Sequence, residues 1–280
     1  MGQLDKKSML CPGCRRLISS DEPSCPYCGL ANPGSPIRKS LTRLSFRDGD
    51  SLIQFIIYVN AAIFILALVL KPSEMGMSLN PFTLLSPSST SLMLLGATGT
   101  IPIDYYHRWW TILTASSLHG GILHIAFNMM ALHQLGPFVT HEYGTARFVI
   151  LYVVSGIAGF VLSYLVGIPF TLGASASVCG LIGAILYYGK SRGGYFGMAI
   201  YRQAMGWIIG LILFGLLLPG INNWAHGGGV AAGIAIGFAL GYEDRVAETL
   251  LHRAIAAVCA LVTAGAILFT VIQALFIRFF

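Results

Sequence analysis

The sequence predicts an all-α polytopic membrane protein with a small cysteine-rich module in front of it. Of its 280 residues, 55% are hydrophobic and only 10% are charged, whereas an ordinary soluble domain carries about 25% charged residues. A helix needs about 20 consecutive apolar residues to cross a bilayer core about 30 Å thick, and the chain contains several such runs. This composition excludes a soluble globular protein. We therefore interpret the net charge of +6 as a signal of membrane topology.

The amino-terminal module is predicted from four cysteines. They form two Cys-x-x-Cys pairs separated by ten residues, and each pair can offer two thiolates to one tetrahedral zinc ion. The first ten residues are polar and do not resemble a signal peptide, so we expect a cytoplasmic module in which reduced thiols favour zinc over two disulfides. The sequence therefore predicts a structural zinc ribbon over residues 1–32, with the ligands Cys11, Cys14, Cys25 and Cys28.

A basic linker is expected at residues 33–50, because Pro33, Gly34 and Pro36 are typical of a flexible joint. Its cations could contact anionic lipid or a partner protein, and nucleic acid is not an expected partner. These cations are Arg38, Lys39, Arg43 and Arg47.

Seven transmembrane helices are expected, six in a core over residues 51–245 and one more in residues 246–280. The segment between the first and second spans is rich in Tyr and Trp, which are enriched at membrane interfaces, so we expect it to be an irregular interfacial loop. The spans are approximately Leu52–Leu70, Leu118–Phe138, Phe148–Val166, Ala174–Tyr188, Ala204–Leu218, Ala225–Tyr242 and Ala254–Phe276.

The charges predict the orientation of these spans. With the amino terminus inside, fourteen of the seventeen Lys and Arg residues fall on the inner side, as the positive-inside rule expects. We therefore expect a multi-pass protein of a bacterial inner membrane, with its amino terminus in the cytoplasm. In this orientation Ser175 and His226 both lie near the outer ends of their helices.

Polar residues within the spans indicate chemistry, because they are costly in a bilayer. Serine becomes a nucleophile only when a base within hydrogen-bond reach takes its proton, so we predict Ser175 as nucleophile and His226 as base. A lone intramembrane Ser or His more often satisfies its own helix or a neighbour. The residues of the second, fourth and sixth spans that we consider for chemistry are His119, His124, Asn128, His133, Ser175, Ser177 and His226.

Small residues explain how the two helices could approach each other. Glycines follow His226 at four-residue spacing, and Gly180 and Ala184 form a small-residue strip on the fourth span. The alternative is that the glycines serve packing alone. They are Gly229, Gly233, Gly237 and Gly241.

A stabilising site for an oxyanion is predicted on the second span. His124 and Asn128 are four residues apart, hence on one helix face, and both side chains can donate hydrogen bonds to a developing negative charge. The amide of Ser175, near a helix amino terminus, could add another donor. The alternative is that the pair merely bridges helices.

Three separated segments of the chain resemble the rhomboid intramembrane serine proteases, in that family's order. The segment from Leu118 to Met129 resembles the HxxxxHxxxN helix, Gly173 to Ala184 the serine motif, and Ala225 to Gly233 the histidine motif. The resemblance covers roughly Trp109 to Tyr242. A single motif would be weak, and the ordered trio is specific.

The resemblance implies a rhomboid-like six-helix core, which some members extend by a seventh helix. It implies a Ser175–His226 dyad without a third acid, an oxyanion hole from His124 and Asn128, and no catalytic cofactor. It also implies transmembrane protein substrates that are cut near the outer face, and a loop after the first helix that His119 helps to order.

The chain departs from the family pattern at several positions. Ala176 replaces the usual Gly after the serine, and its methyl group is expected to crowd the site and to lower or narrow activity. Trp110–Thr111 stands where Trp-Arg is frequent, with Arg108 just upstream, and Thr140 replaces a usual Glu. These changes concern the loop and the inner end more than the dyad.

Rival interpretations remain open at this point. Ser177 is a second candidate nucleophile, but two residues along a helix it points about 160° away from Ser175. Cys179 is read as a small packing residue. A rhomboid-like scaffold that binds transmembrane clients without cleaving them is the main alternative function, and a transporter is disfavoured because paired broken helices are not evident.

Overall fold

The computed structural model describes residues 8–11, 16–34, 49–71, 84–218 and 220–279. The chain divides into two compact units, residues 1–52 and 53–280. The predicted boundaries of a zinc ribbon, a linker, a core and an additional helix stay predictions. The predicted cations of the linker, from Arg38 to Arg47, lie outside the described residues.

The small unit contains one two-stranded antiparallel sheet. Strand β1 (Ser8–Leu10) pairs with β2 (Leu17–Ser19), and Met9 lies opposite Ile18. The buried side chains are Ile18 and two cysteines, with Met9 and Leu30 packed against them. Such a small cluster buries little apolar surface, so the sheet alone is a weak source of stability.

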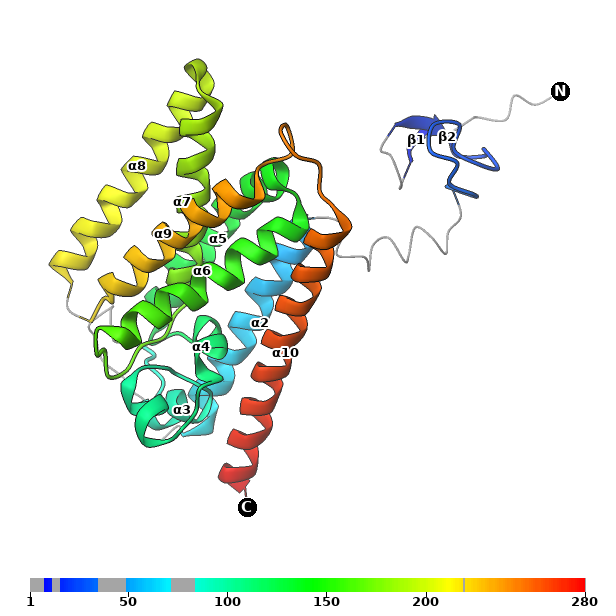
Figure 1. Ribbon diagram of the computed structural model, residues 1–280. Coiled ribbons are helices and arrows are strands. Elements are labelled where there is room, and N and C mark those ends of the chain that lie inside the picture. Colours follow the sequence, from blue (N-terminus) through cyan, green and yellow to red (C-terminus); the bar gives the residue numbers. More distant parts are fainter. Residues whose placement is uncertain (1–7, 12–15, 35–48, 72–83, 219, 280) are drawn as a thin grey trace. The chain divides into compact units, whose positions relative to one another are not determined.

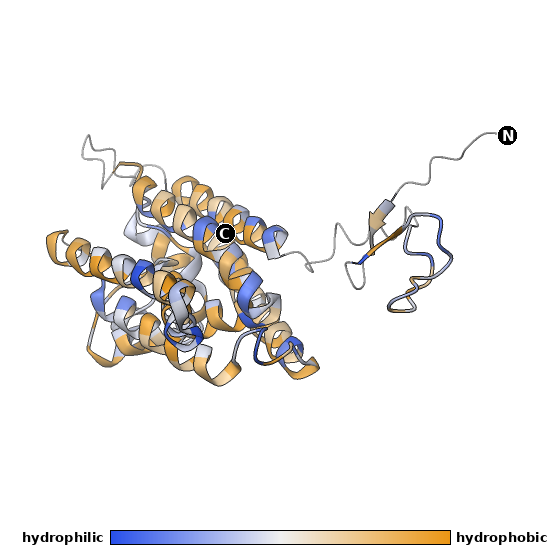
Figure 2. Cartoon of the chain, turned by 90° about the horizontal axis from the view of Figure 1, so that it is seen from above, coloured by the Kyte–Doolittle hydropathy of each residue, from blue (hydrophilic) through white to orange (hydrophobic). Residues whose placement is uncertain are grey.

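The large unit is built from seven long helices in the described residues, which confirms the all-α polytopic class (Figure 1). Hydrophobic residues predominate along these helices (Figure 2). Five are long and apolar enough to cross a membrane, namely α2, α5, α6, α8 and α10. The helices are α2 (Gly49–Leu70), α5 (Ile122–Tyr143), α6 (Thr145–Leu165), α7 (Ser175–Arg192), α8 (Gly194–Leu217), α9 (Asn223–Leu240) and α10 (Leu250–Phe279).

Most helix ends differ by a few residues from the sequence prediction, and two of the starts have a clear reason. Helix α5 begins at Ile122 rather than Leu118, because the backbone is extended at Leu118 and at Gly121. His119 therefore lies in the turn before the helix and not on it. Helix α8 begins ten residues before the expected Ala204, because a helix can continue beyond the apolar stretch that a hydropathy pattern detects.

Helices α7 and α9 form the most extensive contact between two elements and position the site. A methyl group on Gly233 would collide with the carbonyl oxygen of Gly180, and one on Gly229 would collide with that of Ala176. Backbones come this close only where side chains are absent. The predicted packing of the two glycine-containing faces is confirmed.

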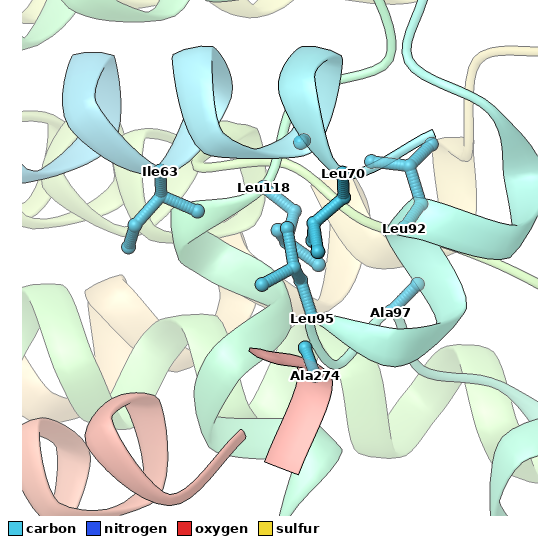
Figure 3. Packing of buried hydrophobic residues seen from close by; sticks show 8 residues of the cluster. Ile63, Leu70, Leu92, Leu95, Ala97, Leu118 and Ala274 are labelled. Carbon is cyan, nitrogen blue, oxygen red and sulfur yellow. The ribbon is translucent and has the colours of Figure 1, made fainter. Parts of the chain in front are cut away.

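The loop between α2 and α5 is irregular in its described part, residues 84–121. It contains four short helices and packs by its apolar residues against the carboxyl ends of α2 and α10. Figure 3 shows Leu70 of α2, Leu95 and Leu118 of the loop, and Ala274 of α10 converging in one buried cluster. The short helices are α3 (Ser89–Leu94), the π-helix η2 (Ile101–Tyr105), α4 (Thr111–Thr114) and the 3-10 helix η3 (Ala115–Ser117).

Candidate active site and metal centre

Ser175 is the first residue of α7, and the segment in front of it is held to the loop by its backbone. Thr171 and Thr98 form an antiparallel bridge with N···O distances of 2.7 and 2.9 Å. The amide of Gly173 donates to the carbonyl of Ala115 at 2.9 Å. Gly173 itself has φ +125°, a conformation that favours glycine. The hydroxyl of Ser175 therefore emerges from a constrained turn.

His226 lies one turn into α9 and reaches Ser175. Its Nε2 is 2.9 Å from the Ser175 Oγ, which is a hydrogen-bond distance. Its Nδ1 is buried and has no hydrogen-bond partner among the described residues. The structure thus brings together the two side chains that the sequence singled out, across 51 residues of chain.

His124, on the first turn of α5, faces the same turn. The amide of Gly120 donates to its Nδ1 at 3.3 Å, so the neutral ring carries its proton on Nε2. A Cβ on Gly173 would lie 2.7 Å from this Nε2 and 3.6 Å from the Ser175 Oγ. The Nε2–H donor and the Ser175 hydroxyl therefore both face the space next to Gly173.

Asn128 is buried one turn further along α5. Its Nδ2 donates to the His124 carbonyl at 2.9 Å, so one of its two N–H groups is engaged with its own helix. The predicted pair thus divides in the structure: His124 presents a donor to the turn of Ser175, whereas this bond of Asn128 stays within the helix.

The comparisons with known proteins locate this site in a recognised domain. The model of the rhomboid domain matches residues 106–243, which include Ser175, His226, His124 and Asn128. The chain belongs to the rhomboid family. It is 35% identical to RHOMBOID-like protein 4 of Arabidopsis thaliana over 164 residues, 56% of this chain and 40% of that protein. It is 37% identical to Rhomboid protease GluP of Bacillus subtilis over 134 residues, 48% and 26% of the two chains.

The rhomboid domain accounts for about half of the chain, and the matches span between about a quarter and about half of the relatives' lengths. RHOMBOID-like protein 6, mitochondrial, of A. thaliana is 33% identical over 168 residues, 58% of this chain and 52% of that protein. The shared part is therefore the helical domain that carries Ser175.

Four further polar residues lie elsewhere in the rhomboid domain. Ser177 is fully buried, and its Oγ lies 3.3 Å from the Oγ of Ser116, away from His226. His119 is also fully buried, with its ring edge-on to that of His124 at 5.1 Å, and its ring nitrogens have no hydrogen-bond partner within the described ranges. His133 and His141 are exposed on α5.

Ala176 was expected to crowd the site. In the structure its methyl group is fully buried in a cluster with Ala115, Phe160 and Ala225. Gly159 leaves room for it, because a Cβ added there would lie only 3.0 Å from the Ala176 Cβ. The Ala176 methyl group is thus part of the helix packing, and the absence of a side chain at Gly159 of α6 provides the space that it occupies. Cys179 is buried as well, as expected for a packing residue.

Three of the four predicted metal ligands meet in the small unit. The sulfur atoms of Cys11, Cys25 and Cys28 all lie within 4.8 Å of one another, and those of Cys11 and Cys28 are 3.7 Å apart. Two thiolates bound about 2.3 Å from one tetrahedral zinc ion would be separated by about 3.8 Å, so the geometry fits this metal. Cys14 lies outside the described residues.

Sequence reasoning missed two residues that shape the site. Gly173 creates the turn before Ser175, and Asn222 caps α9 one turn before His226. A glycine just before a functional serine and an asparagine just before a helical run are recognisable signals. Neither signal reveals which distant residues the turn and the cap contact.

Proposed function

We propose that this chain is a serine-type intramembrane endopeptidase that cleaves transmembrane proteins through a Ser175–His226 dyad. The observation that carries this proposal is the 2.9 Å contact between the Ser175 Oγ and the His226 Nε2. Serine requires a base at this distance to become a nucleophile. Both side chains are partly exposed, which leaves a route for a substrate, and a relative named as a rhomboid protease supports the same reaction class.

In the proposed reaction the Ser175 Oγ attacks the carbonyl carbon of the scissile peptide, and its proton passes to the His226 Nε2. When the tetrahedral intermediate collapses, the same Nε2–H protonates the leaving amine, and an ester remains on Ser175. A water molecule then attacks this ester and gives its proton to the His226 Nε2. The proton returns to the Ser175 Oγ as the ester bond breaks, and the new carboxylate is released. The unpartnered Nδ1 of His226 supports a mechanism in which no acidic side chain orients the base.

His124 is the proposed principal side-chain donor to the oxyanion. Its Nε2–H group lies beside Gly173 and Ser175, and its tautomer is set by the Gly120 amide. The backbone N–H of Ser175, at the amino terminus of α7, is a second donor. Asn128 is proposed as a further donor through the N–H group that does not bond the His124 carbonyl. One such donor contributes about 2.7–4 kcal/mol of transition-state stabilisation.

The proposed topology follows from the basic residues of the sequence. With the amino terminus in the cytoplasm of a bacterial inner membrane, the dyad lies toward the outer face. Substrates are therefore proposed to be single-span or polytopic membrane proteins that are cut near that face, with the lipid bilayer as the surrounding medium.

The direct test is cleavage of a model single-span substrate by the full chain purified in detergent and reconstituted in vesicles. The wild type is expected to cleave it and to react with a fluorophosphonate probe at Ser175. Ser175→Ala and His226→Ala are expected to lose cleavage, whereas Ser177→Ala, which removes the neighbouring buried hydroxyl, retains the activated serine.

Two outcomes would contradict the proposal. Cleavage at equal rates by the wild type and Ser175→Ala would exclude the dyad. Stable capture of transmembrane clients with neither cleavage nor probe labelling would instead support the alternative, a rhomboid-like scaffold that binds membrane proteins without catalysis.

A structural zinc ion is proposed for the small unit, held by Cys11, Cys14, Cys25 and Cys28. The support is the 4.8 Å cluster of three sulfur atoms and the pairing of the fourth cysteine with Cys11 in a Cys-x-x-Cys sequence. The ion would supply folding free energy to a unit with a small core, and the proposed peptide cleavage does not use it.

A further inference from the structure

The side chain of Asn222 uses all of its polar atoms at the junction between α6, the α6–α7 loop and α9. Its Oδ1 accepts from the amide of Ala225 at 3.0 Å and so caps α9. Its Nδ2 donates to the Ser163 Oγ at 2.7 Å and to the Thr171 Oγ1 at 2.9 Å. Both hydroxyl partners are buried. One side chain therefore joins three segments.

Two of these bonds, the cap on the Ala225 amide and the bond to Thr171, lead to the two halves of the dyad. The Asn222 carbonyl accepts from the His226 amide at 3.2 Å, so Asn222 and His226 occupy successive turns of one helix end. Thr171 lies four residues before Ser175, on the segment whose backbone is paired with Thr98. Asn222 thus connects the turn that carries the nucleophile to the helix that carries the base.

The network continues into the loop between α2 and α5. The Thr111 Oγ1 donates to the Thr98 Oγ1 at 3.0 Å, and Thr111 is fully buried. Thr98 in turn is the backbone partner of Thr171. Thr171 therefore contacts both Thr98 of the loop, through its backbone, and Asn222 at the start of α9, through its hydroxyl. The bond from Asn222 thus fixes the start of α9 relative to the loop.

We infer that Asn222 is a positioning residue for the proposed hydrolysis: one of its N–H donors ties the start of α9 to Thr171 in the segment before Ser175, the other ties it to Ser163 of α6, and together they set the separation of the His226 Nε2 from the Ser175 Oγ. The inference rests on the proposed function of the dyad. Its physical basis is that a proton transfer needs a heavy-atom distance of about 2.6–3.2 Å, and that a misplacement of about 1 Å can reduce a rate by about 10²-fold.

Asn222→Ser separates positioning from helix capping. The replacement retains an oxygen that can accept from the Ala225 amide, and Ser and Asn are comparable caps. Its shorter side chain cannot make the two hydrogen bonds to Ser163 and Thr171. We expect kcat for the single-span substrate to fall by about ten- to a hundredfold with KM little changed, and the thermal unfolding midpoint to fall as well, because two buried hydroxyls lose a partner.

Partner and control variants sharpen this test. Thr171→Val, which removes one acceptor, is expected to lower kcat in the same sense, and adding it to Asn222→Ser is expected to cost less than the product of the two single effects. Asn60→Ser is the matched control. Asn60 is also a buried helix-associated asparagine, but its Nδ2 bonds the Ile56 carbonyl within α2, and wild-type kcat is expected for it.

Hydrogen–deuterium exchange provides a readout that does not depend on catalysis. Asn222→Ser is expected to speed exchange in residues 171–175 and in the first turn of α9, and Asn60→Ser is not. Unchanged exchange there, or a wild-type kcat in Asn222→Ser while Ser175→Ala is inactive, would overturn the inference. If the wild type itself neither cleaves nor labels, the proposed function fails, and the exchange result still decides whether Asn222 holds the two segments together.

Discussion

Gly173 lies two residues before Ser175 and has φ +125°. A side chain at this position would meet two penalties. The backbone conformation is unfavourable for residues with a Cβ, at about 1–3 kcal/mol, and the new methyl group would lie 2.7 Å from the His124 Nε2. The first penalty affects folding, whereas the second moves a side chain that faces the dyad.

Gly173→Ala is therefore expected to lower both the unfolding midpoint and the rate at which a fluorophosphonate labels Ser175. Gly167→Ala is the matched control, because Gly167 also has a positive φ, of +82°, in the same α6–α7 loop, but no atom lies within 4 Å of a Cβ added there. Gly167→Ala is expected to lower the unfolding midpoint but not the labelling rate, and both quantities are measured for the two variants. Equal loss of labelling in the two variants would show that backbone strain alone, and not the contact with His124, is responsible.

Helix α10 is more than an appended span, because one of its faces holds the loop between α2 and α5. The Nη2 of Arg108 donates to the Gln273 Oε1 at 3.0 Å and to the Leu94 carbonyl at 2.9 Å. The ring of Trp110 packs edge-on against Phe269 at 5.2 Å. At the end of α10, Arg278 donates to the Leu70 carbonyl of α2. The loop that pairs with the Ser175 turn is thus anchored from outside the matched rhomboid domain.

Gln273→Ala is expected to lower the free energy of unfolding by about 1.5–3 kcal/mol, the usual contribution of a hydrogen bond to a charged group. Arg108 is only 9% exposed, so its lost partner is not readily replaced by water. Thermal or denaturant unfolding in detergent measures the effect. Leu268→Ala, which removes a side chain that is 61% exposed on the same helix, is expected to change little. Equal stability of the Gln273→Ala variant and the wild type would contradict this role of α10.

The molecule consists of two units whose stabilities have different sources. The large unit is held by close helix contacts such as those of α7 with α9. In the described part of the small unit the buried cluster consists of Cys11, Ile18 and Cys25, and a metal ion is the expected main source of its folding free energy. The proposed dyad, His124 and Asn222 all belong to the large unit.

Cys25→Ser is accordingly expected to abolish binding of about one zinc ion per chain and to leave labelling of Ser175 unchanged. Metal analysis of the purified full chain gives the first quantity, and the fluorophosphonate rate gives the second. Cys259→Ser, which removes a cysteine of α10 far from the cluster in sequence, is the control and is expected to retain zinc. Retention of zinc by Cys25→Ser would exclude this ligand set.

Sequence by itself determined the class of the protein and the identity of its chemical groups. Apolar runs predict spanning helices because a bilayer leaves few other ways to satisfy the backbone. The spacing of Cys25 and Cys28 predicts a thiolate pair because two intervening residues let both sulfurs face one ion. Ser175, His226, His124 and Asn128 are predicted as site residues because polar groups are rare in such runs and the order of the three motifs is specific.

Only the tertiary structure decided how these groups act on one another. The 2.9 Å contact of Ser175 with His226 depends on the packing of α7 against α9. The tautomer of His124 depends on the Gly120 amide, and the burial of the Ala176 methyl group depends on the gap left by Gly159. Asn222 and Gln273 gain their roles from partners 51 to 165 residues away. Hydropathy and spacing report local preference, whereas distances across such separations follow from the packing of the whole helical unit.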